Sequence, residues 1–382
     1  MDILSFALGY KKGKSTGGGG GTSGDERVKY VTFMRGEEEL LKYPVISGDT
    51  CRNPVSKGLI DTPTKEQTVS TVYTYSGWSL TDGGAASSSA LQNVTEDRTV
   101  YAAFAESVRT YTINFYDGET LLTSKQVAYG TKPSYTPTKE GYVFMGWSPE
   151  ITEVTCDTDY IAIFEEASDF ANGSWEYISR VSKAGSAATV FKEGDTRKET
   201  LTWSDGTTEE ITFTIGAIYD ADTEDGTPVI TIVPTGLISK QSKYHTKNGE
   251  SYNPLQYTDT VLHTFLMETV KPALPANLQS VMQTAWCRSN VLGTKTRLPI
   301  CSLCYCDLGQ QNCGTPKLYG FGTGNNSDQI RRYADGTAGY WWLGDRGIDS
   351  ITKPLQVNTN GQITTSNGAN LTGVGVMFKI FV

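Results

Sequence analysis

Alternating hydrophobic and polar positions in the second half of the chain predict strands joined by short turns. Residues 211–215 alternate apolar and polar side chains, and they follow Asp205-Gly206, a dipeptide typical of hairpin turns. The apolar run 229–233 predicts another strand, and residues 174–235 are expected to form strands. The last run, 374–382, is apolar enough to be a buried central strand.

A helical spacing of apolar residues is found in the same half. It covers residues 258–270, with Asp259 near the start and Pro272 just past the end. A second short helix is predicted over 274–282. The apolar residues of the first helix are Val261, Leu262, Phe265, Leu266 and Val270. The C-terminal part is therefore expected to combine sheets with two helices.

Two segments of the first half, residues 28–106 and 107–166, carry the same motifs in the same order. The anchor residues recur, whereas the loops between them are shorter in the second segment. The matched pairs are Phe33 with Phe115, Gly36 with Gly118, Gly48 with Gly130, Trp78 with Trp147, and Asp97 with Asp157. A duplicated unit with fixed strands and variable loops predicts a modular spacer or display architecture.

The motifs of the second copy are F-x-x-G at 115–118, G-Y-x-F-x-G-W at 141–147 and Y-x-A-x-F at 160–164. This pattern resembles the internalin B-repeat, also called the Listeria–Bacteroides repeat. The first copy lacks the G-Y-x-F stretch and carries an insert at 82–90. The resemblance implies a small β-grasp fold for each repeat and a role in extending and presenting another domain.

Residues 174–382 carry a further set of motifs. The clearest are W-x-x-I at 175–178, Y-W-W-L at 340–343 and the strand 375–378. They resemble a C-type-lectin-like C-terminal domain of phage and prophage structural proteins of Firmicutes. Relatives have Arg-Ser-Pro where this chain has Gly344-Asp345-Arg346, so the resemblance carries over the fold and no ligand preference.

Together the two resemblances imply a mostly β protein with some α, multi-domain and elongated. Two small β-grasp repeats would precede a C-terminal α+β domain of the C-type-lectin-like fold. With 382 residues the chain has room for several domains. The net charge of −9 argues against nucleic acid and against anionic membranes as partners, and no run is long enough to insert into a membrane.

Residues 1–27 are expected to form a docking arm followed by a glycine-rich linker. Asp2 stands where a secretory signal needs positive charge, and the glycines at 17–21 predict a flexible tether. A short apolar peptide cannot bury itself alone, so docking on a larger assembly is favoured over a frayed terminus. The residues expected to dock are Ile3, Leu4, Phe6 and Leu8.

Four of the seven cysteines form the cluster Cys301, Cys304, Cys306 and Cys313. Its spacing lacks the second pair that a zinc site needs, so no metal is expected. Zinc, a disulfide within the cluster and buried free thiols all remain open, and free thiols are favoured. The odd number of cysteines suits folding in a reducing cytoplasm.

No nucleophile, zinc-protease or phosphate-loop motif occurs, so neither an enzyme nor a cofactor is expected. Neighbouring side chains in a strand point to opposite faces, so one of Trp341 and Trp342 is expected in the core and the other at the surface. An ordinary turn-rich surface is the alternative to a contact surface here. The candidate ligand-binding residues are Arg331, Arg332, Tyr333, Trp342, Asp345, Arg346, Asn367 and Asn370.

These features predict a bacteriophage virion surface protein, a fibre or decoration, folded in the host bacterial cytoplasm before assembly. Its arm would bind other virion proteins, and its lectin-like domain would bind a host cell-surface glycan or protein. A homo-oligomer is expected, with a trimer favoured. The alternatives are a capsid or tail decoration without a ligand and a bacterial surface adhesin of the internalin type.

Overall fold

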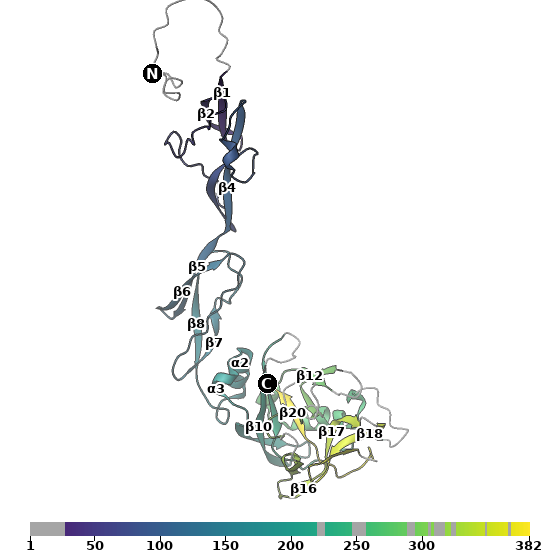
Figure 1. The fold of residues 1–382 in the computed structure, drawn as a ribbon. Helices are drawn as coiled ribbons and strands as arrows, with labels where there is room; N and C mark the ends of the chain where they lie inside the picture. Colours follow the sequence, from purple (N-terminus) through teal and green to yellow (C-terminus); the bar gives the residue numbers. More distant parts are fainter. Residues whose placement is uncertain are drawn as a thin grey trace, which may run out of the picture. The chain divides into compact units, whose positions relative to one another are not determined.

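The computed structural model describes residues 27–219, 226–246, 257–288, 295–304, 307–308, 318–321, 326–347, 350–365 and 368–382 (Figure 1). Strands hold 41% of the residues and helices 13%, which confirms the expected mostly β fold with some α. The chain divides into two compact units. One is Met1–Tyr135 with Pro149–Ile161, and the other is Thr136–Ser148 with Ala162–Val382.

The first repeat is a four-stranded mixed sheet. Its strands are β1 (Val28–Arg35), β2 (Glu38–Ile46), β3 (Thr71–Ser79) and β4 (Arg98–Val108), and their order across the sheet is β2-β1-β4-β3. The central strands β1 and β4 run parallel, and each outer pair is antiparallel. The short helix η1 (Ser88–Ala90) ends the insert, and its Ala90 is buried in the core of the repeat beside Phe33 and Trp78.

The second repeat has the same topology. Its strands are β5 (Thr110–Asp117), β6 (Thr120–Ala128), β7 (Tyr142–Ser148) and β8 (Thr158–Glu166), in the order β6-β5-β8-β7. The recurring aspartates have the same structural role in both repeats. Asp97 Oδ1 accepts a hydrogen bond from Tyr30 N at 2.8 Å, and Asp157 Oδ1 accepts one from Thr112 N at 2.7 Å. Each carboxylate fixes the start of the central parallel pair.

The C-terminal part is built on a five-stranded sheet with the order β14-β20-β11-β10-β9. The strands are β9 (Thr196–Thr202), β10 (Thr208–Tyr219), β11 (Val229–Pro234), β14 (Ile300–Ser302) and β20 (Phe378–Phe381). The turn between β9 and β10 contains Gly206 at a φ of 80°, which confirms the predicted hairpin. Strand β20 is buried inside the sheet, as expected for the end of the chain.

A helix opens this part, where strands were expected. Helix α2 (Trp175–Lys183) is followed by α3 (Ala187–Val190), so the expectation of strands throughout 174–235 is wrong for its first third. Ser174 caps α2 by accepting a hydrogen bond from Tyr177 N at 3.1 Å. The helix buries Trp175, Ile178 and Val181, and this spacing is helical, although the neighbouring strand patterns conceal it.

The predicted pair of helices lies in one broken helical segment. It comprises η3 (Tyr257–Asp259), α4 (Val261–Phe265), the π-type turn η4 (Leu266–Val270), α5 (Lys271–Ala273) and then α6 (Ala276–Val281). Pro272 lies inside α5, whereas the sequence placed it past the helix end. Val270 and Lys271 before it are already helical, so this proline lies within a continuous helical run, at the change from the π-type turn to α5.

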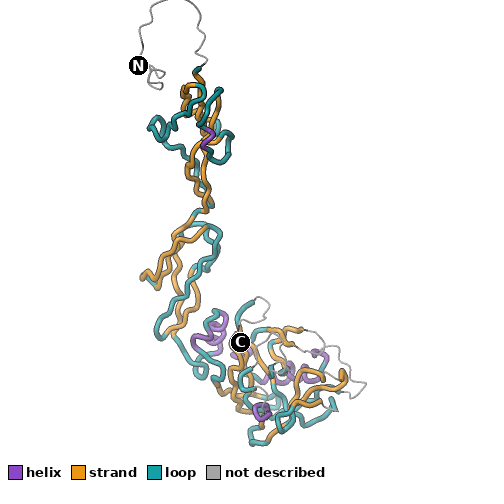
Figure 2. The backbone as a smooth tube through the Cα atoms, viewed as in Figure 1, coloured by secondary structure: helices purple, strands orange, loops and turns teal. Residues whose placement is uncertain are grey.

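Smaller sheets complete the C-terminal part (Figure 2). One ribbon pairs β12 (Ala285–Arg288) with β13 (Lys295–Leu298), and another pairs β15 (Arg331–Arg332) with β16 (Ala338–Gly339). The third sheet contains β17 (Trp341–Gly347), β18 (Ser350–Val357) and β19 (Ile363–Thr365), and η5 (Asn326–Gln329) precedes β15. Two hydrophobic clusters, one around Trp342 and one around Trp341, fill the space between these layers.

Strand β7 of the second repeat also packs into the C-terminal core. Val143 is buried in the cluster that contains Trp175 and Ile178. Ser186 Oγ donates a hydrogen bond to the carbonyl oxygen of Phe144, and Arg180 pairs with Glu165. The second compact unit therefore includes β7, although the repeat motif alone assigns this strand to the repeat.

The structure pairs Cys301 with Cys287 in a disulfide, so the expectation that Cys301 is a free thiol is wrong. Strand β14 carries Cys301, and β12 brings Cys287 to a Cα–Cα distance of 6.4 Å. The partner lies outside the sequence cluster, which is why the spacing did not reveal it. Cys304 is buried, and Cys306 and Cys313 lie outside the described residues.

The change Cys287→Ser is expected to lower the free energy of unfolding by about 3 kcal/mol, because the disulfide closes a loop between residues 14 apart. Denaturant unfolding with and without reductant measures this loss. Cys156→Ser removes an exposed thiol of the second repeat and is the control. Equal stability of wild type with and without reductant would show that the two sulfurs are not bonded.

Candidate functional site

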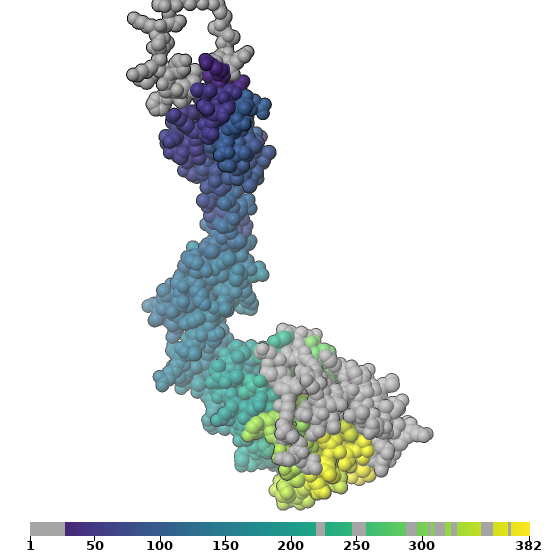
Figure 3. Space-filling model, in the orientation of Figure 1, coloured from purple at the N-terminus to yellow at the C-terminus, as the bar shows by residue number. Residues whose placement is uncertain are grey.

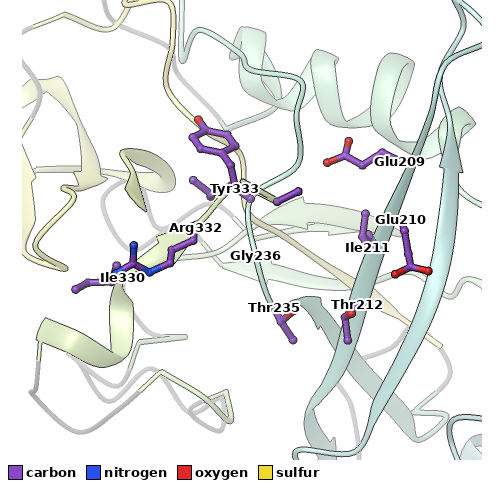
Figure 4. Close-up of a pocket in the computed structure, with 11 residues that line it drawn as sticks. Glu209, Glu210, Ile211, Thr212, Thr235, Gly236, Ile330, Arg332 and Tyr333 are labelled. Carbon is purple, nitrogen blue, oxygen red and sulfur yellow. The ribbon is translucent and has the colours of Figure 1, made fainter. Parts of the chain in front are cut away.

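An open groove of about 370 Å³ lies in the C-terminal part between β10 and the segment that begins with β15 (Figure 4). We call it the β10–β15 groove. Three separate stretches of sequence build it: the start of β10, the loop after β11, and β15 with its flanking residues. Its lining consists of Glu209, Glu210, Ile211, Thr212, Thr235, Gly236, Leu237, Ile330, Arg332, Tyr333 and Ala334.

Glu209 and Glu210 both line the groove from strand β10, and as neighbours in a strand their side chains point to opposite faces of the sheet (Figure 4). Glu209 is held in place, because its two oxygens accept hydrogen bonds from Ser239 N at 2.8 Å and Ser239 Oγ at 2.7 Å. Glu210 pairs with Lys198 at 2.8 Å, and both side chains are largely exposed. Exposed pairs of this kind contribute little free energy. The Glu210 carboxylate can therefore exchange Lys198 for a ligand donor.

The opposite wall carries Arg332 and Tyr333. The exposed Arg332 guanidinium donates one hydrogen bond, from Nη1 to the carbonyl oxygen of Gly336 at 2.7 Å. Tyr333 is half-buried, and its hydroxyl accepts a hydrogen bond from Gln241 Nε2 at 3.0 Å. A Cβ at Gly339 would lie 2.6 Å from the tyrosine ring, so only glycine permits this close packing. The ring therefore has a fixed orientation.

The structure brings Arg332 and Tyr333 together in the groove, whereas Arg331 has a structural role. Arg331 donates hydrogen bonds to the carbonyl oxygens of Asp328 and Gly320, at 2.7 and 3.0 Å, and its guanidinium stacks on Phe321 at 4.1 Å. Burial lowers the pKa of Arg331 to about 10. A guanidinium that is engaged in this way has little capacity left for a ligand.

Trp342 is fully buried, so the expectation that it contacts a ligand is wrong. Its Nε1 donates a hydrogen bond to the carbonyl oxygen of Ser242 at 2.8 Å, and its ring packs on Tyr244. Trp341 is equally buried and donates to the carbonyl oxygen of Gln329. Strand β17 lies between the two hydrophobic clusters, so both of its faces are covered. The alternation of side chains holds, but neither face meets solvent.

Among the described residues, none of the remaining sequence candidates lines the groove. Asp345 and Arg346 lie in β17, with side chains outside the described residues, and Asn370 is exposed in a turn. Asn367 and the expected docking residues Ile3, Leu4, Phe6 and Leu8 also lie outside the described residues. The contribution of these residues to binding stays a prediction.

The sequence did not single out the acidic wall of the groove. Glu209 and Glu210 follow the hairpin turn, where acidic pairs usually form a solvated face. They line the same groove as Arg332 only because of the tertiary fold, since that residue is more than a hundred positions away in the chain. No local pattern could connect the two walls. In the space-filling view, the middle of the chain and its end share the surface of the C-terminal part (Figure 3).

A buried ion pair lies elsewhere in the same part of the chain. Lys379 Nζ lies 2.7 Å from both carboxylate oxygens of Asp307, and the side chains are 7% and 2% exposed. Asp307 Oδ2 also accepts a hydrogen bond from Cys304 N at 2.8 Å. Both carboxylate oxygens are therefore satisfied, and the pair fastens Cys304 and Asp307 to the central strand β20.

Within the described ranges, no group of three or more metal-ligating side chains comes together. Among those same residues, no helix combines the length and the apolar composition needed to cross a bilayer. A scan against protein-family models finds no match for this chain, and a search of curated proteins finds no relative at the significance required.

Proposed function

We propose that this chain is a bacteriophage virion surface protein that displays its C-terminal domain for binding to a host cell surface. The observation that carries the proposal is the duplication of one small sheet topology ahead of a larger domain with an open polar groove. Modules of the same topology in series extend a domain away from its point of attachment and need no catalytic site of their own. The β10–β15 groove is the proposed contact surface for a host glycan or protein.

The groove supports binding better than catalysis. Glu209, the more enclosed carboxylate, already accepts two hydrogen bonds from Ser239, so it is not poised to take a proton from a substrate. The groove is also open, whereas catalytic sites exclude water from the reacting atoms. Rigid walls that present polar groups suit recognition of a surface ligand.

The proposal assigns the first residues of the chain to docking on other virion proteins, and it includes a homo-oligomer with a trimer favoured. The motifs that resemble internalin B-repeats and the C-type-lectin-like domain of phage structural proteins support it. A capsid or tail decoration without a ligand is the second candidate.

Arg332→Ala is expected to reduce binding of the labelled full chain to host cells about tenfold, because truncating a central contact residue costs roughly 1–3 kcal/mol. Flow cytometry on a panel of Firmicutes strains measures the binding. The matched control is Arg52→Ala, which removes an exposed arginine of the first repeat and should leave binding unchanged. Absence of wild-type binding to every strain would favour the decoration without a ligand, and equal binding by Arg332→Ala would exclude the groove.

A further inference from the structure

The polar groups that remain open in the β10–β15 groove are both donors and acceptors. The hydroxyls of Thr212 and Thr235 make no hydrogen bond to the described residues. Arg332 uses one N–H on Gly336 and keeps further donors, and Glu210 has only its exposed pair with Lys198. A complementary ligand therefore needs several groups that each donate and accept a hydrogen bond.

Tyr333 adds an aromatic surface at one end of this polar set (Figure 4). Its packing against Gly339 and its hydrogen bond from Gln241 fix the ring before any ligand arrives. Because the ring is already fixed, it loses little conformational entropy when a ligand binds, and the entropic cost of the contact is low. Beside hydroxyl-binding groups, such a ring can pack on the apolar C–H face of a sugar ring.

Two other ligand classes fit the groove less well. A phosphate-bearing polymer would meet Arg332, but it would also meet the carboxylates of Glu209 and Glu210 on a chain with a net charge of −9. An apolar peptide would need a deeper and more hydrophobic pocket than this lining offers. An uncharged hydroxyl group can donate a hydrogen bond to a carboxylate and accept one from Arg332, so it suits both sides of the groove.

We propose that the β10–β15 groove binds an uncharged saccharide chain, through Arg332, Glu210 and the two threonine hydroxyls, with Tyr333 stacked on a sugar ring. This inference rests on the proposed binding to a host surface and narrows its ligand from a glycan or protein to a neutral polysaccharide. Two measurements on the full chain separate the ligand class from the host-binding function.

The first measurement uses host cells treated with periodate, which cleaves vicinal diols, or with a broad protease. Periodate should remove about nine tenths or more of the bound protein, the loss expected when the main contacts disappear, and protease should leave binding unchanged. Loss of binding after protease alone would overturn the saccharide inference and leave the host-binding function standing. No binding to untreated cells of any strain would overturn both.

The second measurement compares Glu210→Gln with wild type at low and high salt. For a neutral saccharide, loss of the charged acceptor should weaken binding about three- to tenfold, and raising NaCl from about 50 mM to about 0.5 M should change binding less than twofold. A phosphate-bearing ligand predicts the opposite, because the variant removes a repelling charge and frees Lys198. Tighter binding by Glu210→Gln, or a loss of about tenfold at high salt, would therefore overturn the inference.

Discussion

Lys379→Met is expected to destabilise the C-terminal part by about 3–5 kcal/mol, because it leaves the Asp307 carboxylate buried without its counter-charge. The loss would be a large fraction of the free energy of unfolding of an ordinary domain. The pair is nearly inaccessible, with both carboxylate oxygens 2.7 Å from Lys379 Nζ. Denaturant unfolding followed by tryptophan fluorescence measures the change.

The control removes the second charge as well. In the double variant Lys379→Met with Asp307→Asn, an amide oxygen remains to accept the hydrogen bond from Cys304 N, and no unpaired charge is buried. Most of the lost stability should therefore return. If the double variant is as unstable as the sum of the two single variants, the two side chains are not coupled and the pair is not buried as described.

Trp342→Ala is expected to destabilise the same part by about 3–5 kcal/mol, since it empties a fully buried site and orphans the carbonyl oxygen of Ser242. Chemical unfolding measures the effect. Tyr340→Ala is the matched control, because that side chain is 44% exposed on the same segment and should change stability by less than about 0.5 kcal/mol. A small effect of Trp342→Ala on stability would show that this tryptophan is exposed at the surface.

The duplicated sheets could be predicted because their signals are local. Gly36 and Gly118 both have a φ of 58° in equivalent hairpin turns, and Asp97 and Asp157 bind the same backbone position. Residues with such backbone roles recur wherever the strands recur. The hairpin at Gly206 was predictable for the same reason, since its turn requires a positive φ at the glycine whatever the surrounding structure.

The wrong or missed predictions all concern features that depend on which other parts of the fold pack against an element. Trp342 was expected at a surface because alternation reveals two faces without saying whether the second face is covered. Cys301 found a partner in Cys287, on a separate ribbon that the cluster spacing does not include. Glu210 and Arg332 line one groove because β15 packs beside the loop after β11. Each of these depends on tertiary packing.

Strand β7 has a mechanical consequence for the C-terminal part. It is paired with β8 in the sheet of the repeat, and it also places Val143 in the C-terminal core. Rotation about residues 167–173 would expose Val143 and separate Arg180 from Glu165. A pull on the C-terminal domain is therefore resisted by hydrophobic packing, and the linking residues do not act as a swivel. Strand β7 and that domain, which belong to one compact unit, would therefore respond to tension together.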